Sequence, residues 1–204
     1  MKRAYAYIDG FNLYYRAVKG TAYKWLNLRQ MCEMLVPEYT LERIKYFTAP
    51  VSGKDEAGKP IRQQTYLRAL RTIGCEVIRG KFLSRDVYMR LAEDKTQTVL
   101  VTKTEEKGSD VNLAAHLLID GFDKHYEAAI VLSNDSDLTM PIRYVRDQLG
   151  FEIMVINPDR FVTSKSLTQA ASSVRQLREG VLQACQFPEV VKYPKGVIKK
   201  PANW

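Results

Sequence analysis

Apolar residues along this chain form two kinds of pattern. Mostly apolar segments of strand length occur at 4–9, 128–132 and 151–156, and such segments are typical of strands that are covered on both faces. Residues 28–36 and 110–121 instead place their apolar positions three and four apart, which predicts amphipathic helices. The chain therefore alternates buried strands with helices.

The remaining elements follow from the same patterns. Strands are expected at 43–49 and 75–79, and helices at 11–18, 61–73 and 137–149. This alternation predicts an α/β fold, with a central, mostly parallel sheet that is flanked by helices. In sheets of this class, ligands bind beyond the carboxyl ends of the strands.

Two segments break the alternation. Residues at about 81–104 are rich in β-forming side chains around a short polar stretch, which predicts an inserted antiparallel ribbon. Residues 164–184 have helical spacing, and the lysine- and proline-rich end of the chain indicates an extended tail. We therefore expect a core domain over residues 1–160. A C-terminal helix and basic extended tail over 161–204 would pack on or near it.

Composition narrows the class of protein. A chain of 204 residues that is 46% hydrophobic can bury one full core. It has no apolar run near the roughly 18 residues of a membrane helix. The N-terminus leads directly into a strand, so we expect no signal peptide, no membrane partner and a cytoplasmic location. The three cysteines are widely spaced and form neither a zinc pattern nor a disulfide framework.

Charge adds a candidate partner. The chain has 31 Lys and Arg against 23 Asp and Glu, a formal net charge of +8. A basic balance favours a polyanionic partner such as nucleic acid, although many basic proteins bind none.

Four aspartates are the candidate chemistry. Asp9 ends the first strand, Asp110 opens a helix, and Asp135 and Asp137 follow the strand at 128–132. Helix capping explains any one of them alone. Gathered at one sheet edge, they would repel one another unless a cation intervened. Oxygen ligands without nearby His or Cys favour Mg²⁺ or Mn²⁺, and such a metal activates water and stabilises charge on a phosphate.

Other polar residues border this predicted site. Asn12 lies one helical turn after Asp9, and Ser133 and Asn134 offer polar groups at a helix start, where anions bind. Basic side chains that would either contact the phosphates of a nucleic acid or remain solvated surface charges are Lys103, Lys107, Arg62, Arg68 and Arg143. Aromatic residues that would either stack on unpaired bases or pack in the core are Tyr14, Tyr15, Tyr23 and Trp25.

Three motifs together resemble the NYN domain, a branch of the PIN-like nuclease superfamily. They are Tyr7-Ile8-Asp9-Gly10-Phe11-Asn12, Lys107-Gly108-Ser109-Asp110-Val111-Asn112-Leu113 and Val131-Leu132-Ser133-Asn134-Asp135-Ser136-Asp137-Leu138. The resemblance spans about residues 4–157. It implies a Rossmann-like PIN fold and a Mg²⁺- or Mn²⁺-dependent endoribonuclease.

The resemblance also implies roles for single residues. The family's catalytic and metal-binding acids match Asp9, Asp110, Asp135 and Asp137, and its asparagine matches Asn12. The chain departs from the family pattern at three positions: Asn134, Leu138 and His116 stand where many relatives have Gly, Phe and an acidic residue.

Two other interpretations stay open. The first is a catalytically silent RNA-binding or regulatory NYN protein that keeps the acidic pocket. The second is a phosphohydrolase of the haloacid dehalogenase type, because Asp135 and Asp137 form an Asp-x-Asp pair after a strand. In that fold the pair follows the first strand, whereas here it follows the fourth predicted core strand. RNA, single-stranded or structured, is the expected partner, and the sequence leaves open whether the chain forms a homodimer.

Overall fold

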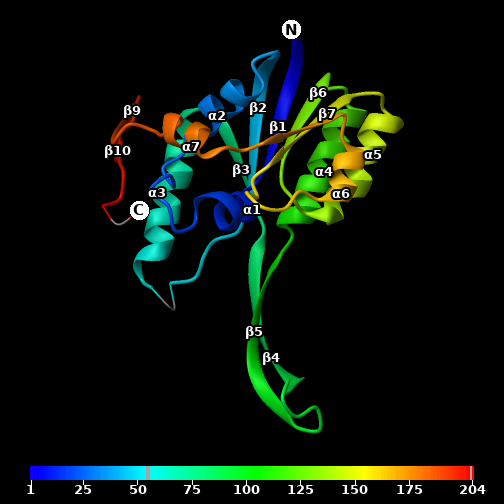
Figure 1. The fold of residues 1–204 in the computed structure, drawn as a ribbon. Coiled ribbons are helices and arrows are strands. Elements are labelled where there is room, and N and C mark those ends of the chain that lie inside the picture. The colour runs from blue at the N-terminus through cyan, green and yellow to red at the C-terminus, as the bar shows by residue number, and fades with distance from the viewer. Residues whose placement is uncertain (54–55, 203) are drawn as a thin grey trace.

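A parallel sheet forms the centre of the molecule. The computed structural model describes residues 1–53, 56–202 and 204. Within these residues, six strands pair in the order β3-β2-β1-β6-β7-β8, all in parallel (Figure 1). These strands are β1 (Lys2–Asp9), β2 (Tyr39–Thr48), β3 (Cys75–Arg79), β6 (Ala128–Leu132), β7 (Glu152–Asn157) and β8 (Ser173–Gln176). The predicted α/β fold with a parallel sheet is confirmed.

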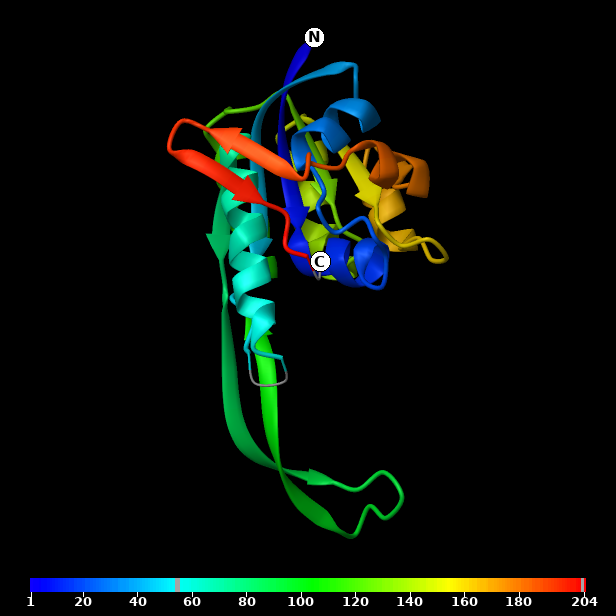
Figure 2. The ribbon, with the colours of Figure 1, turned by 90° about the vertical axis from the view of Figure 1, so that its left-hand side faces the viewer.

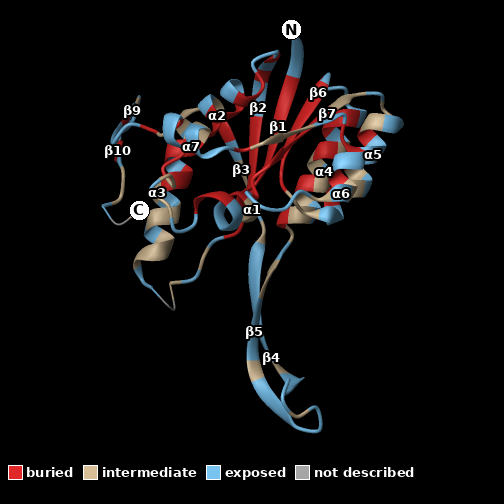
Figure 3. Cartoon of the chain, in the orientation of Figure 1, coloured by how far each residue is buried: buried red, intermediate tan, exposed pale blue. Residues whose placement is uncertain are grey.

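The apolar runs are buried because helices cover both faces of this sheet. Along β1, Ala4, Ala6 and Ile8 pack into one hydrophobic core, whereas Tyr5 and Tyr7 pack into the other. Successive side chains of a strand point to opposite faces, so a strand between two cores carries apolar residues at every position. Figure 3 shows the buried residues concentrated in the sheet and on the inner sides of the helices.

Helices of the described residues cover both faces of the sheet. The helices α2 (Leu28–Leu35), α3 (Gly58–Thr72) and α7 (Glu179–Ala184) cover one side (Figure 1). The other side is covered by α4 (Ser109–Phe122), α5 (Thr139–Asp147) and α6 (Lys165–Ala170). At the carboxyl edge, β1 leads into the short α1 (Gly10–Leu13) and the π-helix η1 (Tyr14–Val18). No helix in the described ranges is long and apolar enough to span a bilayer.

A two-stranded ribbon projects from the carboxyl edge of the sheet. It consists of the antiparallel strands β4 (Lys81–Arg90) and β5 (Thr98–Lys107) (Figures 1 and 2), and most of it is exposed (Figure 3). At its base the two strands come together beside Gly80, where a β-carbon would lie 2.7 Å from the carbonyl oxygen of Lys107. Glycine therefore permits the crossing that joins the ribbon to the sheet.

The prediction of a single helix over 164–184 is wrong. Helix α6 ends at Ala170, and β8 then extends the sheet before α7 begins. The edge of β7 offers unpaired backbone groups, and pairing with them outweighs the helical spacing of this segment.

The tail forms a hairpin rather than an extended strand. The antiparallel strands β9 (Val190–Tyr193) and β10 (Gly196–Lys199) lie beside α3 (Figure 2). Val191 and Ile198 are buried in the core of that side, and the Trp204 ring packs on Trp25 with 6.3 Å between centroids. The tail therefore closes one of the two hydrophobic cores.

Candidate functional site

An open pocket lies at the carboxyl edge of the sheet, with a volume of about 270 Å³. It is bounded by the end of β1, the first helical turns, the base of the ribbon, the start of α4 and the end of β6. Its lining residues are Asp9, Phe11, Asn12, Tyr15, Phe82, Glu106, Ser109, Asp110 and Asp135. Three of the four predicted aspartates, together with Asn12, thus meet at the edge where the sequence places them.

Asp9 is the most constrained of the carboxylates. It is buried, and it accepts hydrogen bonds from the backbone and side-chain amides of Asn12, at 2.9 and 2.8 Å, and from the Ser133 hydroxyl at 2.9 Å. Burial raises the pKa of Asp9, whereas these three hydrogen bonds act in the opposite direction. Asp9 caps α1 and also lines the pocket, so the capping role and the site role coexist.

Asp110 does not cap its helix. Gly108, with φ of 100°, occupies the N-cap position of α4, and Asp110 lies in the first turn. Burial, together with the charges of Asp9, Asp135, Glu106 and Asp137, raises the pKa of Asp110 to about 6. The carboxyl of Asp110 is therefore close enough to the other acids for their charges to disfavour its ionised form.

The segment after β6 holds Asp135 beside Asp9. The Ser133 hydroxyl donates to Asp9 and accepts from the backbone amide of Asp135 at 3.1 Å. One oxygen of Asp135 caps the 3₁₀ turn η2 (Ser136–Leu138) by accepting from the amide of Asp137 at 3.0 Å. Asp137 itself is exposed and does not line the pocket, although its charge contributes to the pKa of Asp110.

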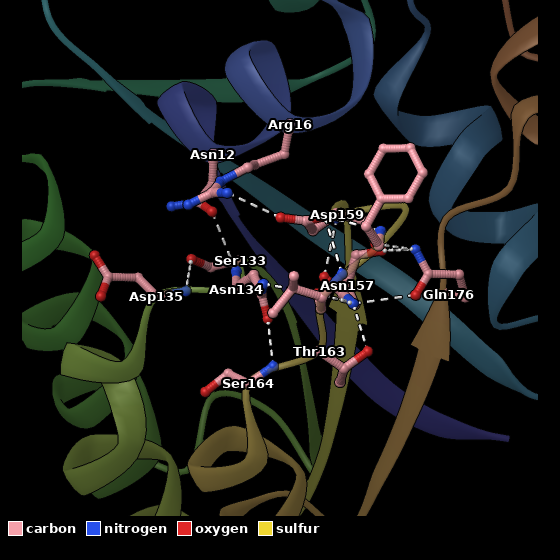
Figure 4. Close-up of polar contacts among 12 residues, drawn as sticks. Asn12, Arg16, Ser133, Asn134, Asp135, Asn157, Asp159, Thr163, Ser164 and Gln176 are labelled. Carbon is pink, nitrogen blue, oxygen red and sulfur yellow. Dashed lines mark hydrogen bonds and ion pairs between the residues drawn. The ribbon is translucent and has the colours of Figure 1, made fainter.

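A polar network leads away from the pocket through Asn134 (Figure 4). The backbone amide of Asn134 donates to the Asn12 side chain at 3.3 Å. The Asn134 side chain donates to the Val162 carbonyl at 2.9 Å and accepts from the Ser164 amide at 2.8 Å. Asn134 therefore joins the pocket to the loop after β7, and its side chain is committed to that loop.

That loop is fixed at a second point. Asp159 accepts from the backbone amides of Phe161 and Val162, at 2.9 and 3.2 Å, and from Arg16 at 2.9 Å (Figure 4). Arg16 belongs to η1, so this ion pair ties the loop to the helical turns that follow Asp9.

Glu106 is a site residue that lies outside the predicted aspartate set. It lines the pocket and accepts from the backbone amide and the hydroxyl of Ser109, at 3.1 and 2.8 Å. Phe11 and Phe82 also line the pocket. The position of Phe82 depends on how the ribbon leaves the sheet, and no spacing in the sequence carries that information.

The predicted basic residues lie elsewhere. Lys103 and Lys107 pair with Glu105, at 2.7 and 3.5 Å, and strand alternation puts them on the opposite ribbon face from Glu106. On α3, Arg62 pairs with Glu56 and Arg68 lines a separate surface pocket, while Arg143 is exposed on α5. None of these five lines the acidic pocket.

The predicted aromatic residues separate into two groups. Tyr15 lines the pocket, whereas Trp25 is fully buried against Tyr66 and Phe187. Tyr23 is only partly exposed and packs against the core around Trp25. Of these candidates, Tyr15 alone is placed beside the carboxylates.

The donor set of the pocket suits a hard divalent cation. The side chains of Asp9, Asp110, Asp135, Glu106 and Asn12 offer oxygen atoms, which Mg²⁺ and Mn²⁺ prefer. Across residues 1–53, 56–202 and 204, however, no three His, Cys, Asp or Glu side chains already surround one point as ligands. Binding a cation would therefore require the carboxylates to move closer together.

The family of the chain follows from its sequence over most of its length. Residues 3–178 match the model of the NYN domain. The chain belongs to the NYN domain family. This family is part of the PIN-like superfamily, its members are typically nucleases, and such nucleases generally use divalent metals. The family therefore suggests a nuclease-like function.

Two individual proteins are similar to this NYN chain. One is the 6-hydroxy-3-succinoylpyridine 3-monooxygenase HspA of Pseudomonas putida (strain DSM 28022 / S16). The two sequences are 28% identical over an alignment of 235 residues, which covers 99% of this chain and 75% of that protein. The other is the crystal structure of a protein of unknown function from Vibrio parahaemolyticus RIMD 2210633. It has a TM-score of 0.59 and 16% identity, and the match covers 87% of this chain and 94% of that one. At that identity the structure supports the fold alone.

Proposed function

We propose that this NYN protein is a divalent-metal-dependent endoribonuclease. The observation that carries the proposal is the meeting of Asp9, Asp110 and Asp135 in one pocket, although they come from three distant segments. The proposal is also supported by the family of the chain, because NYN proteins are typically nucleases. RNA is the proposed partner, and the basic surface would attract its backbone.

Each polar residue of the site would have its own role in cleavage. Asp9, Asp110 and Asp135 would hold Mg²⁺ or Mn²⁺, with Asp137 acting through water from the rim. The bound cation would supply positive charge to the phosphate and make water a better nucleophile. Asn12 already fixes Asp9 with two hydrogen bonds and would keep that carboxylate oriented. Water would attack phosphorus and the 3′-oxygen would leave with a proton, which yields a 5′-phosphate.

The charge of the pocket explains the need for a metal. A phosphate brought beside several carboxylates would be repelled in the absence of a cation, because like charges at short range oppose one another. No basic side chain lines the pocket in the described residues. The proposal therefore requires that cleavage stop when divalent ions are chelated.

The cysteines agree with a cytoplasmic location. Cys32, Cys75 and Cys185 are all free and buried. Burial raises the pKa of Cys32 to about 12, so this thiol stays protonated and unreactive. We propose the cytoplasm as the compartment, where RNA is present and thiols stay reduced.

The test is a cleavage assay with labelled RNA and either Mg²⁺, Mn²⁺ or a chelator. The wild-type chain should cleave only with metal, and Asp110→Asn should lose cleavage. Asp123→Asn is the matched control, because Asp123 is an exposed carboxylate at the other end of α4. Equal cleavage by Asp110→Asn and the wild type would refute the site. RNA binding without cleavage under every metal condition would favour the catalytically silent alternative.

A second candidate comes from the pocket's aromatic lining and the Pseudomonas putida relative. That relative is named as a monooxygenase of a pyridine compound, and Phe11, Tyr15 and Phe82 would accommodate an aromatic ring. Oxidation of such a ring consumes dioxygen and a reductant. Measuring NADH and oxygen consumption with a hydroxypyridine, in parallel with the RNA assay, separates the two functions.

A further inference from the structure

Three aromatic rings form one side of the acidic pocket. The rings of Phe11 and Tyr15 are nearly parallel, with centroids 6.4 Å apart, and Phe11 meets Phe82 edge to face at 5.9 Å. Phe11 and Tyr15 lie one helical turn apart after β1, and Phe82 enters from the base of the ribbon. All three line the pocket, and we call them the aromatic wall.

Core packing does not account for this wall. Tyr15 is 59% exposed and Phe82 is 36% exposed, whereas Trp25 in the nearby core is fully buried. Clustered rings that face solvent in a concave site are typical of surfaces that bind a ligand. The part of the wall left open to the pocket is therefore available to a planar group.

Charged groups of both signs lie near the wall. The Lys19 ammonium lies over the Tyr15 ring, 4.9 Å from its centroid, while Asp9, Asp110 and Asp135 line the rest of the same pocket. Lys19 covers one face of the Tyr15 ring, so a planar uncharged group would contact the surface of the wall that lines the pocket. Anionic groups would lie at Lys19 and, through a cation, at the carboxylates. A nucleotide has this arrangement, because its base is flat and the phosphates on both sides are negative.

We infer that the aromatic wall binds an unpaired nucleobase next to the scissile phosphate, with Tyr15 and Phe82 as the residues on which the base stacks. This inference rests on the proposed ribonuclease function. Base stacking on an aromatic side chain is sequence-tolerant, because every base has a flat face. A paired base is already stacked inside its duplex and must be pulled out to reach Tyr15 or Phe82. Duplex RNA is therefore the poorer substrate.

Binding to the aromatic wall is measured on the Asp110→Asn chain, so that the probe is not consumed. Intact and abasic strands carry the same phosphates, so the difference between them reports the wall even though this variant should bind Mg²⁺ weakly. The probe is a short labelled oligoadenylate, compared with the same oligonucleotide carrying abasic positions and with its duplex. The intact single strand should bind about tenfold or more tightly than the abasic one. Tyr15→Ala or Phe82→Ala should remove most of that difference, and Tyr15→Phe should keep it.

Tyr88→Ala is the matched control. Tyr88 is 75% exposed on the same ribbon and does not line the pocket, so its loss should leave the affinities unchanged. Phe82→Leu retains an apolar side chain without a flat ring. It should weaken binding of the intact strand while leaving the thermal midpoint near that of the parent, which separates lost stacking from lost folding.

The outcomes separate this inference from the proposed function. Equal binding of intact and abasic strands, with metal-dependent cleavage by the wild type, overturns the aromatic wall and leaves the nuclease. No cleavage of any RNA with Mg²⁺ or Mn²⁺ overturns the nuclease itself. Saturable binding of nicotinic acid that Tyr15→Ala abolishes, without any preference for intact RNA, assigns the wall to a small aromatic ligand and overturns the inference.

Discussion

The hydroxyl of Ser133 donates a hydrogen bond of 2.9 Å to the carboxylate of Asp9, although the two residues are 124 positions apart. Strands β1 and β6 are paired in parallel, with Ile8 opposite Leu132. The residues that come next, Asp9 and Ser133, therefore lie side by side where the two strands end. Parallel pairing thus brings two strand ends, and the polar residues on them, to one side of the pocket.

Removing this hydroxyl should impair the site more than the fold. Ser133→Ala takes away one of the hydrogen bonds that oppose the raised pKa of Asp9, and it frees the amide of Asp135 from its acceptor. We expect cleavage to fall about 10- to 100-fold, as for other groups that orient metal ligands, with about 1 kcal/mol lost from the free energy of unfolding. Steady-state kinetics and urea unfolding measure the two effects.

Ser136→Ala is the control for that variant. Ser136 is an exposed serine in the same segment, so its hydroxyl should be dispensable. If both serine variants cleave RNA at the wild-type rate, Ser133 has no positioning role.

Replacing Asp110 by asparagine should stabilise the metal-free protein. Burial, followed by the charges of Asp9, Asp135, Glu106 and Asp137, opposes ionisation of Asp110 and raises its pKa. A carboxyl whose pKa is raised in the folded state reduces stability once the pH exceeds its unfolded value of about 3.9. In chelator at neutral pH, we expect the thermal midpoint of Asp110→Asn to exceed that of the wild type by about 2–5 °C.

Bound metal should reverse the order of these two thermal midpoints. Mg²⁺ or Mn²⁺ binds the folded wild-type site and should raise its midpoint with concentration, while Asp110→Asn should respond weakly. A wild-type midpoint that is insensitive to millimolar Mg²⁺ and Mn²⁺ would contradict the metal site. Asp123→Asn should behave as the wild type in both buffers.

A buried ion pair holds the far end of α4. The Lys45 ammonium contacts the Asp120 carboxylate at 2.6 Å, and the Tyr7 hydroxyl donates to the same oxygen at 2.6 Å. Both charged residues are buried. Lys45→Met leaves the Asp120 carboxylate with only the Tyr7 hydroxyl and the His125 ring, 3.4 Å away, as side-chain partners among the described residues. This should reduce the free energy of unfolding by about 3–5 kcal/mol. Lys195→Met, at an exposed lysine, should have little effect.

The loss in Lys45→Met should depend on pH. Burial alone would raise the pKa of Asp120, but the hydrogen bonds from Lys45 and Tyr7 outweigh it and lower that pKa. In the wild type, Asp120 therefore stabilises the fold above its unfolded value of about 3.9 and loses this effect as the pH falls through the folded value. Without Lys45, burial dominates and the sign reverses. The stability gap between the two chains should narrow as the pH falls from neutral, and a constant gap in urea titrations would contradict this account.

Asn134 should control the loop after β7. Asn134→Ala removes the acceptor of the Ser164 amide and the donor to the Val162 carbonyl. Hydrogen exchange at Ser164 should become faster by about fivefold, because one intramolecular hydrogen bond contributes about 1 kcal/mol. Gln148→Ala, at an exposed amide on α5's end, is the control. Unchanged exchange at Ser164 would show that the hydrogen bonds of Asp159 and Asn157 hold the loop without Asn134.

Much of the fold was predictable because local patterns agreed with the tertiary environment. The apolar runs at 4–9 and 128–132 became β1 and β6, which are the buried centre of the sheet. The strand at 173–176 was not predictable from its own residues. Its conformation depends on pairing with the free edge of β7, a segment elsewhere in the chain.

The site divides in the same way. Of the four aspartates that the sequence placed at the carboxyl edge, Asp9, Asp110 and Asp135 line one pocket. These three could be predicted because strand ends and helix starts are local features. Only the tertiary structure decided what surrounds them. It turned Lys103 and Lys107 away on the ribbon, directed Asp137 to the rim, and brought Phe82 against Phe11. Those placements depend on ribbon register and on contacts between distant segments, which no spacing along one chain encodes.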